Sequence, residues 1–128
     1  MLNKICIRLV GGLGNQLFIY AFGLAKAIRS GKDLIIDDIS GFSDRDIYKA
    51  VYCLDTYSIN ESLFSDSIFK HLIANRYFWL LAKKLRICHV EKKPYSYDHE
   101  VNELNAMFFQ GYWQSYLYFD EYKDIIKD

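Results

Sequence analysis

The spacing of apolar residues in the first part of the chain predicts a strand, a helix and a second strand. Residues 5–10 form a short apolar run rich in β-branched side chains, which is typical of a buried strand. Residues 15–29 are apolar on almost every face, so we expect a helix buried between a sheet and another layer. Residues 34–37 form another apolar run that ends in an acid, which favours a central parallel strand. This order of elements is typical of a parallel α/β sheet.

Further elements are predicted along the rest of the chain. Residues 47–59 are expected to contain a short helix and then a strand, and residues 61–86 carry the longest helical pattern, broken at most once. Residues 87–91 and 107–110 can each form a strand, and Ser115 can cap a last helix that runs to the end of the chain. The predicted fold class is α/β, a Rossmann-like parallel sheet with flanking helices.

The composition is that of one folded domain. The chain has 128 residues, of which 52% are hydrophobic and 17% aromatic, so it can bury a core. Sixteen basic and 16 acidic residues balance, which gives no reason to expect a nucleic-acid partner. Cys6, Cys53 and Cys88 are scattered and odd in number, and neither they nor the histidines stand at metal-ligand spacing. We therefore expect reduced cysteines, a cytoplasmic location and no metal site.

The zero net charge conceals a basic middle and an acidic end. Residues 70–93 hold seven lysines or arginines and one acid, whereas residues 98–128 hold seven acids and two lysines. Within the basic part, residues 76–86 read RYFWLLAKKLR, which is typical of a cationic helix with aromatic anchors at a membrane surface. A core helix whose lysines extend to water gives the same pattern.

The main candidate site is the connection between the first strand and the first helix, which reads GGLGNQ at residues 11–16. Its three glycines permit positive φ and close approach of another group. A helix that opens at Asn15 would present unpaired N–H groups of residues 14–16, the arrangement that binds phosphate. Because Leu17 replaces the third glycine of the dinucleotide pattern, a plain turn capped by Asn15 explains the spacing equally well.

Two other places could carry chemistry. Asp37 and Asp38 follow the second strand, where an acid could hold a ribose hydroxyl, orient an acceptor or act as a base. A solvated strand end is the simpler interpretation of this pair. The turn GYWQS at residues 111–115 could stack on a sugar or a base, or could be a packed loop.

Three stretches of the sequence together resemble one known family. The longest and most specific is GGLGNQLFIYAFGLAKA at residues 11–27. YCLDTYSI at residues 52–59 and GYWQSYLYF at residues 111–119 follow in the order of the family. In these stretches the chain resembles the bacterial α-1,2-fucosyltransferases, glycosyltransferase family 11. The resemblance spans nearly the whole chain and implies one half of a two-domain, GT-B-like glycosyltransferase with Rossmann-like halves.

The resemblance implies an activity and a donor site. Members of the family transfer fucose from GDP-fucose to the 2-hydroxyl of a galactose-type acceptor glycan, with inversion. They generally need no metal or other cofactor, so helix N-termini and cations must stabilise the GDP leaving group. Gly12, Gly14, Asn15 and Gln16 would line the donor site, whereas no catalytic base is assigned. Acceptors of bacterial relatives are often lipid-linked, which implies peripheral contact with the inner membrane face.

One motif of the family is missing from the sequence. Members carry a His-x-Arg-Arg-Gly-Asp-Tyr-type motif after the third stretch, and its arginine is expected to bind the donor diphosphate. Residues 1–128 therefore resemble a truncated N-terminal portion of a fucosyltransferase domain. We expect this portion to be inactive alone. A truncated product, a fragment and one piece of a split enzyme whose other half is a second chain are all open interpretations. Two alternatives stay open: a small Rossmann-type nucleotide-binding domain, for example for NAD, and a non-catalytic membrane-associated module built on residues 76–86.

Overall fold

The protein is built around a parallel sheet. The structure, a computed structural model, describes residues 3–42, 62–63, 75–92, 96–104 and 106–122. Within these residues, a five-stranded sheet has the order β3-β2-β1-β5-β4, and every pairing is parallel. The strands are β1 (Lys4–Arg8), β2 (Asp33–Asp37), β3 (Ser62–Leu63), β4 (Cys88–Val90) and β5 (Phe108–Gln110). The predicted α/β class is confirmed, and the fold is consistent with a Rossmann-like domain.

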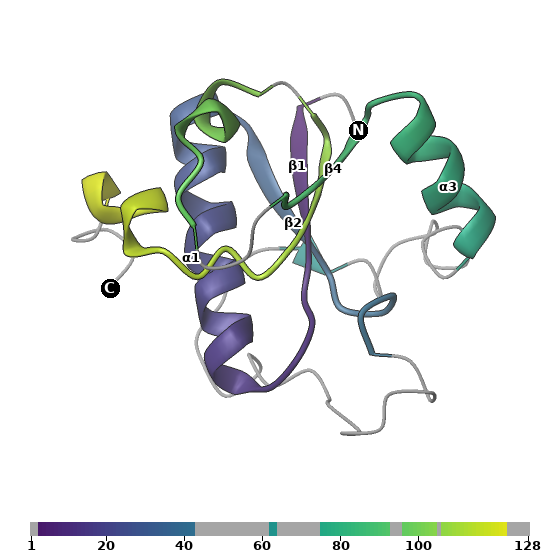
Figure 1. Cartoon of the computed structure of the whole chain (residues 1–128), viewed down its shortest axis with the longest axis horizontal. Helices are drawn as coiled ribbons and strands as arrows, with labels where there is room; N and C mark the ends of the chain where they lie inside the picture. Colours follow the sequence, from purple (N-terminus) through teal and green to yellow (C-terminus); the bar gives the residue numbers. More distant parts are fainter. Residues whose placement is uncertain (1–2, 43–61, 64–74, 93–95, 105, 123–128) are drawn as a thin grey trace.

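The long helix α1 (Leu13–Ser30) covers one face of the sheet (Figure 1). Phe22 of α1 shares one core cluster with Ile5 and Ile7 of β1. Gly23 lets the helix approach, because a Cβ there would come within 2.6 Å of the Ile7 side chain. The helix ends at Ser30, and Gly31 is its C-cap, with a left-handed φ of 66° and a backbone N–H that donates to the Ile28 carbonyl at 3.2 Å.

The shorter helix α3 (Arg76–Lys84) covers the opposite face (Figure 1). Asn75 caps its start by accepting a hydrogen bond from the Tyr77 N–H at 2.9 Å. Trp79 and Ala82 are buried against the sheet, where Cys6 of β1 belongs to the same cluster. Alternate side chains of a strand point to opposite faces of the sheet. Because β1 is covered on both faces, Ile5, Cys6 and Ile7 are all buried and apolar, as the sequence pattern indicated.

Two predicted helices are wrong in extent. Residues 61–86 are not one helix, since β3 lies at their start and pairs with β2, and the described helix begins only at Arg76. Ser115 is a cap as predicted, since its Oγ accepts a hydrogen bond from the Leu117 N–H at 3.4 Å. It caps only the 3-10 turn η4 (Tyr116–Tyr118), which is followed by η5 (Asp120–Tyr122), in place of a continuous α-helix. Packing of this segment on α1 overrides its helical periodicity. The predictions for residues 47–59 lie outside the described residues.

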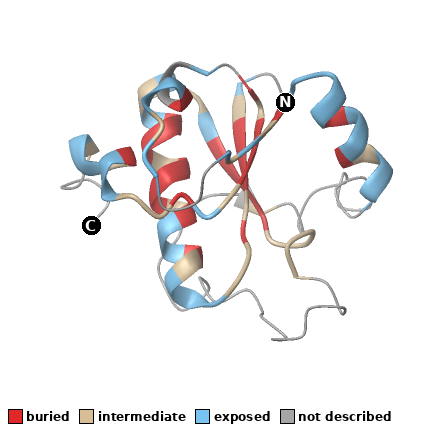
Figure 2. Ribbon diagram, viewed as in Figure 1, coloured by how far each residue is buried: buried red, intermediate tan, exposed pale blue. Residues whose placement is uncertain are grey.

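The C-terminal segments pack against the side of α1 and bury it further. Another 3-10 turn, η3 (His99–Glu103), accepts a hydrogen bond at the Val101 carbonyl from the buried Lys26 ammonium of α1 at 2.8 Å. Phe22 stacks on Trp113 at 4.1 Å between ring centroids and meets Tyr118 edge-on at 5.2 Å. Figure 2 shows the buried side of α1 facing the strands. The expected burial of this helix is confirmed for residues 21–27, apart from the half-buried Leu24, whereas Leu13, Leu17 and Phe18 are exposed.

We predict that Phe22→Ala lowers the free energy of unfolding by about 3–5 kcal/mol, because it opens a cavity between three aromatic rings. Phe18→Ala is the matched control one turn earlier, where the ring is 37% exposed, and should cost about 1 kcal/mol or less. Urea unfolding followed by circular dichroism measures both. Equal losses for the two variants would contradict this account of the core.

Candidate functional site

The strand order places a topological switch point between β1 and β5. From β1 the chain passes through α1 to β2 on one side, whereas β5 and β4 lie on the other side. Open α/β sheets bind ligands at the carboxyl ends of the strands that flank such a point. The loop after β1 is the glycine turn at residues 11–16, and the loop after β5 is the aromatic turn at residues 111–115. The fold therefore brings two motifs that are distant in sequence to one sheet edge.

The glycine turn is held by its own side chains. Gly11 has a φ of 75°, and a Cβ there would come within 2.5 Å of the Asn15 Nδ2, so this position requires glycine. The buried Gln16 donates from its Nε2 to the Gly11 carbonyl at 3.0 Å. Gln16 thus fixes the shape of the turn from inside the protein.

The helix begins earlier than the sequence predicted. Gly12 is the N-cap and α1 starts at Leu13, so Asn15 neither opens nor caps the helix. The Gln16 N–H donates to the Gly12 carbonyl at 3.0 Å, which leaves the N–H groups of residues 13–15 without intrahelical partners. No side chain caps this helix end. The helix start at Leu13 was missed because its N-cap is a glycine, which has no capping side chain to mark it in the sequence.

Two of the predicted donor-binding residues face open space. Gly12 and Gly14 are exposed, and a Cβ built on either would meet no atom within 4 Å. The fold itself does not require glycine at either position, although glycine in the first turn of a helix costs stability relative to alanine. Gly12 serves as the N-cap, whereas room for a ligand close to the backbone is a physical reason for glycine at position 14.

Asn15 joins the two loops of the switch point. Its Oδ1 accepts a hydrogen bond from the Nε2 of Gln114, 99 residues further along the chain. Asn15 is half-buried, so the pair forms part of the wall between the glycine turn and the aromatic turn. The predicted donor-binding residues therefore lie together, with Gly12 and Gly14 exposed, Asn15 in the wall and Gln16 behind it.

Sequence reasoning missed a cationic cavity at the same sheet edge. The cavity has a volume of about 500 Å³, and its lining includes Arg8 and Gln110 at the ends of β1 and β5 and Arg76 and Lys83 of α3. Ser40 holds Arg8, whose Nε donates to the Ser40 Oγ and whose guanidinium NH2 group donates to the Ser40 carbonyl, both at 3.1 Å. No pattern in the sequence could find this site, because only the sheet and the crossing of α3 bring its cations together.

The prediction of a solvated strand end is wrong for Asp37. This residue is fully buried, and its Oδ1 accepts hydrogen bonds from the N–H groups of Ile39 at 3.0 Å and Ser40 at 2.9 Å. Its Oδ2 accepts from the Ser40 hydroxyl. Burial raises the pKa of the Asp37 carboxyl, against these hydrogen bonds and the charge of Arg8. Asp37 shapes the turn that holds Arg8, whereas Asp38 is half-buried beside it.

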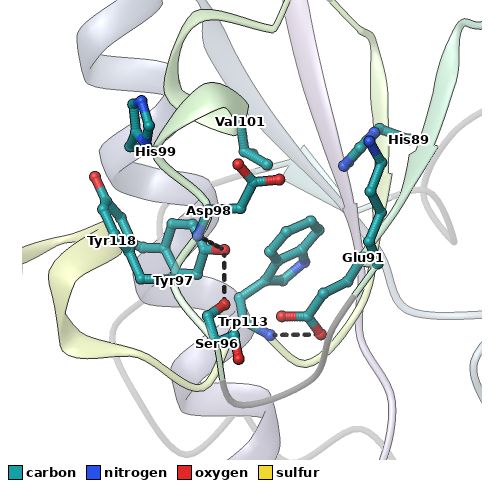
Figure 3. A pocket seen from close by; sticks show the side chains of 10 residues that line it. His89, Glu91, Ser96, Tyr97, Asp98, His99, Val101, Trp113 and Tyr118 are labelled. Atoms are coloured by element: carbon teal, nitrogen blue, oxygen red, sulfur yellow. Dashed lines mark hydrogen bonds between the residues drawn. The ribbon is translucent and has the colours of Figure 1, made fainter.

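A second cavity, of about 260 Å³, lies beside β4 and the aromatic turn (Figure 3). His89, Glu91 and Trp113 contribute to its lining. The Trp113 side chain is 0% exposed, so the alternative of a packed loop is confirmed for this residue, whereas Tyr112 is exposed. Among the described residues, no three His, Cys, Asp or Glu side chains are grouped as metal ligands would be.

The described cysteines lie in the core. Cys6 and Cys88 are free and buried, and Cys53 lies outside the described residues. Burial raises the pKa of the Cys88 thiol to about 11 and raises that of Cys6 as well. Both thiols therefore stay protonated at neutral pH and act as small core residues.

The chain is similar to an α-1,2-colitosyltransferase of Escherichia coli, with 27% identity over 131 residues. The match covers 99% of this chain and 44% of that relative, so the chain spans less than half the length of the curated relative that it matches. No model of a known protein family and no solved structure matches the chain. The similarity runs along nearly the whole sequence and supports a function of the glycosyltransferase type.

We predict that the stability advantage of wild type over Asp37→Asn decreases as the pH rises. Because burial raises the pKa of Asp37 in the folded state, the folded protein favours the neutral carboxyl. That contribution is complete below the unfolded pKa of about 3.9 and is lost as the pH passes the folded pKa. Urea unfolding of both proteins between mildly acidic and neutral pH measures the difference. Asp33→Asn, at the exposed start of the same strand, is the control.

Proposed function

We propose that this chain is part of a glycosyltransferase related to the α-1,2-fucosyltransferases, and that its glycine turn binds the diphosphate of a nucleotide sugar. The observation that carries the proposal is the uncapped start of α1 at the switch point, with Gly12 and Gly14 facing open space. The similarity to a colitosyltransferase and the three stretches that resemble the fucosyltransferases support the same assignment.

The electrostatics of the sheet edge suit a departing diphosphate. Unpaired N–H groups at a helix start attract phosphate oxygens, and the helix dipole adds positive potential there. The cavity lined by Arg8, Arg76 and Lys83 adds cations at the same edge. Preorganised donors and cations of this kind stabilise the charge that develops as a sugar leaves a diphosphate, so the proposed reaction needs no metal.

The substrates follow from the resemblance. We propose GDP-fucose as the donor and the 2-hydroxyl of a galactose-type glycan as the acceptor, with inversion. The E. coli relative is named for colitose, so the identity of the transferred sugar is a point that donor assays must establish. Residues 1–128 would form the N-terminal half of a two-domain, GT-B-like enzyme in the cytoplasm. The inactivity of this half alone and its completion by a second chain stay predictions.

We predict that Gly14→Val weakens the binding of GDP about tenfold or more, because its side chain occupies the space in which a phosphate would meet the helix N–H groups. Stability should be unchanged or slightly higher, since a Cβ at this position meets no atom and valine exceeds glycine in helix propensity. Isothermal titration of the chain with GDP and thermal unfolding measure the two effects.

Leu17→Val is the control, because it places the same valine side chain about one turn further along α1, at an exposed position where leucine already stands. Its affinity for GDP should equal that of wild type. An unchanged affinity in Gly14→Val would contradict the assignment of the turn. Binding of NADH in preference to GDP would favour the Rossmann-type dinucleotide alternative.

We also propose that α3 binds an anionic membrane surface, which would bring lipid-linked acceptors close. Tyr77, Leu80, Leu81 and Leu85 are all more than half exposed, beside the lysines at the end of the helix. Apolar side chains surrounded by cations are typical of helices at a lipid interface. In the described part of the chain, no helix has the length and apolar character that a membrane span requires.

We predict that the double variant Lys84→Glu, Arg86→Glu weakens binding to vesicles with anionic lipids about 30-fold or more, since each basic residue near such a surface contributes about 1 kcal/mol. Lys92→Glu reverses one charge outside the helix and should weaken binding by less than half of the free-energy change of the double variant. Sedimentation with anionic and neutral vesicles at low salt measures the affinity. Equal binding of wild type to both kinds of vesicle would exclude this contact.

A further inference from the structure

Three residues that line the cavity beside β4 each carry a buried polar atom without a hydrogen-bond partner in the described part of the chain. The atoms are His89 Nε2, Glu91 Oε2 and Trp113 Nε1 (Figure 3). Buried polar groups in folded proteins are nearly always hydrogen-bonded, because an unpaired one keeps the full penalty of desolvation. Three such atoms on residues that line one cavity indicate that something else supplies their partners.

The Glu91 carboxylate is held with one oxygen left over. Its Oε1 accepts hydrogen bonds from the N–H groups of Tyr112 at 3.0 Å and Trp113 at 3.4 Å. Gly111 lets the loop approach this closely, because a Cβ there would come within 2.5 Å of the Glu91 Cβ. The second oxygen, Oε2, is therefore fixed in place without a partner of its own.

The Trp113 indole is fixed as firmly and offers only its edge. Its ring stacks on Phe22 with an interplanar angle of 7°, and His89 lies across from it at 6.1 Å between centroids. The residue has a positive φ of 53°, which non-glycine residues rarely adopt. Because its faces are covered, the indole has no free ring face on which a flat base could stack, and its buried N–H has no hydrogen-bond partner.

The opposite wall is tied to the core. The Asp98 N–H donates to the Tyr118 hydroxyl at 3.0 Å, and that hydroxyl donates to the Ser96 carbonyl at 3.3 Å. Tyr118 is itself buried against Phe22, so residues 96–98 stand at a fixed distance from the aromatic turn. Figure 3 shows the Trp113 ring between this wall and the Glu91 side chain.

The three atoms select for a hydroxyl group. A carboxylate oxygen can only accept a hydrogen bond and an indole N–H can only donate one, so the ligand must offer both functions. Burial, followed by the charge of Lys92, lowers the pKa of His89, which leaves a neutral ring that can do either. Two carboxylates, Glu91 and Asp98, against one lysine, Lys92, disfavour a phosphate in this cavity.

We propose that this cavity binds one ring of a neutral, hydroxyl-rich sugar through Glu91, Trp113 and His89. Its volume of about 260 Å³ lies just below the range of cavities for drug-sized ligands, which suits a single ring. The site is separate from the glycine turn and differs from it in charge. It does not depend on the proposed function, since its evidence is the set of unpaired atoms.

The test measures binding of methyl β-galactopyranoside, methyl β-glucopyranoside and methyl α-fucopyranoside to the 128-residue chain by saturation-transfer NMR. We expect at least one of them to bind, and Glu91→Gln to weaken that binding about tenfold. Glutamine keeps an oxygen for the Tyr112 N–H but replaces the unpaired acceptor with an amide donor. Trp113→Phe keeps the stacked ring, removes the N–H and should weaken binding similarly. Glu100→Gln, an exposed change in η3 outside the cavity, should have no effect.

Thermal unfolding of each variant distinguishes loss of binding from loss of fold. Because Glu91→Gln and Trp113→Phe are independent, the test remains valid if one of them does not fold. Glu91→Gln should leave the affinity for GDP unchanged, so this proposal and the proposed donor site can fail separately. Absence of binding by all three glycosides, or binding that both cavity variants leave intact, would overturn the proposal. Displacement of a bound glycoside by guanosine would assign the cavity to a nucleobase and overturn the sugar proposal. A crystal soaked with glycoside that shows only water on the three atoms would also overturn it.

Discussion

The stacking of Phe22 on Trp113 is the contact on which both candidate sites depend. It fastens the loop after β5 to α1 across the sheet edge, and Phe109 and Tyr118 pack around the pair. On one side of this anchor, the next residue reaches the glycine turn through the hydrogen bond from Gln114 to Asn15. On the other side, the fixed indole and Glu91, each with an unpaired polar atom, contribute to the lining of the second cavity. One aromatic contact thus sets the geometry of two polar regions.

The two regions differ in charge in a way that fits two different ligands. The sheet edge at the switch point offers backbone N–H groups and the cations of Arg8, Arg76 and Lys83. The cavity beside β4 offers an unpaired carboxylate oxygen and carries Asp98 in its wall. A diphosphate is attracted to the cationic sheet edge and disfavoured in the cavity beside β4, whereas neutral hydroxyl groups suit the cavity beside β4. A protein that handles a nucleotide sugar and a glycan would need both kinds of surface.

The buried Asp37 shows how the fold prepares the cationic side. Its carboxylate accepts hydrogen bonds from the turn at residues 39–40, and Ser40 of that turn holds the Arg8 guanidinium. Gly41 completes the turn, because any side chain there would overlap the Leu9 carbonyl. An acid that looked like a candidate base is therefore a positioning residue for a cation. Its role is visible only when the ends of β1 and β2 are seen side by side.

Local patterns in the sequence determined the strands β1, β2, β4 and β5 and most of α1, because alternating or unbroken apolar residues and glycine ends act within one element. They also located the glycine turn, although the helix starts two residues earlier than Asn15 suggested. Tertiary structure alone decided the two-residue strand β3 and the short 3-10 turns near the end, since packing against β2 and α1 overrides weak local preference. It alone assembled the cationic cavity and the unpaired atoms beside β4, because their residues are distant in sequence and only the strand order brings them together.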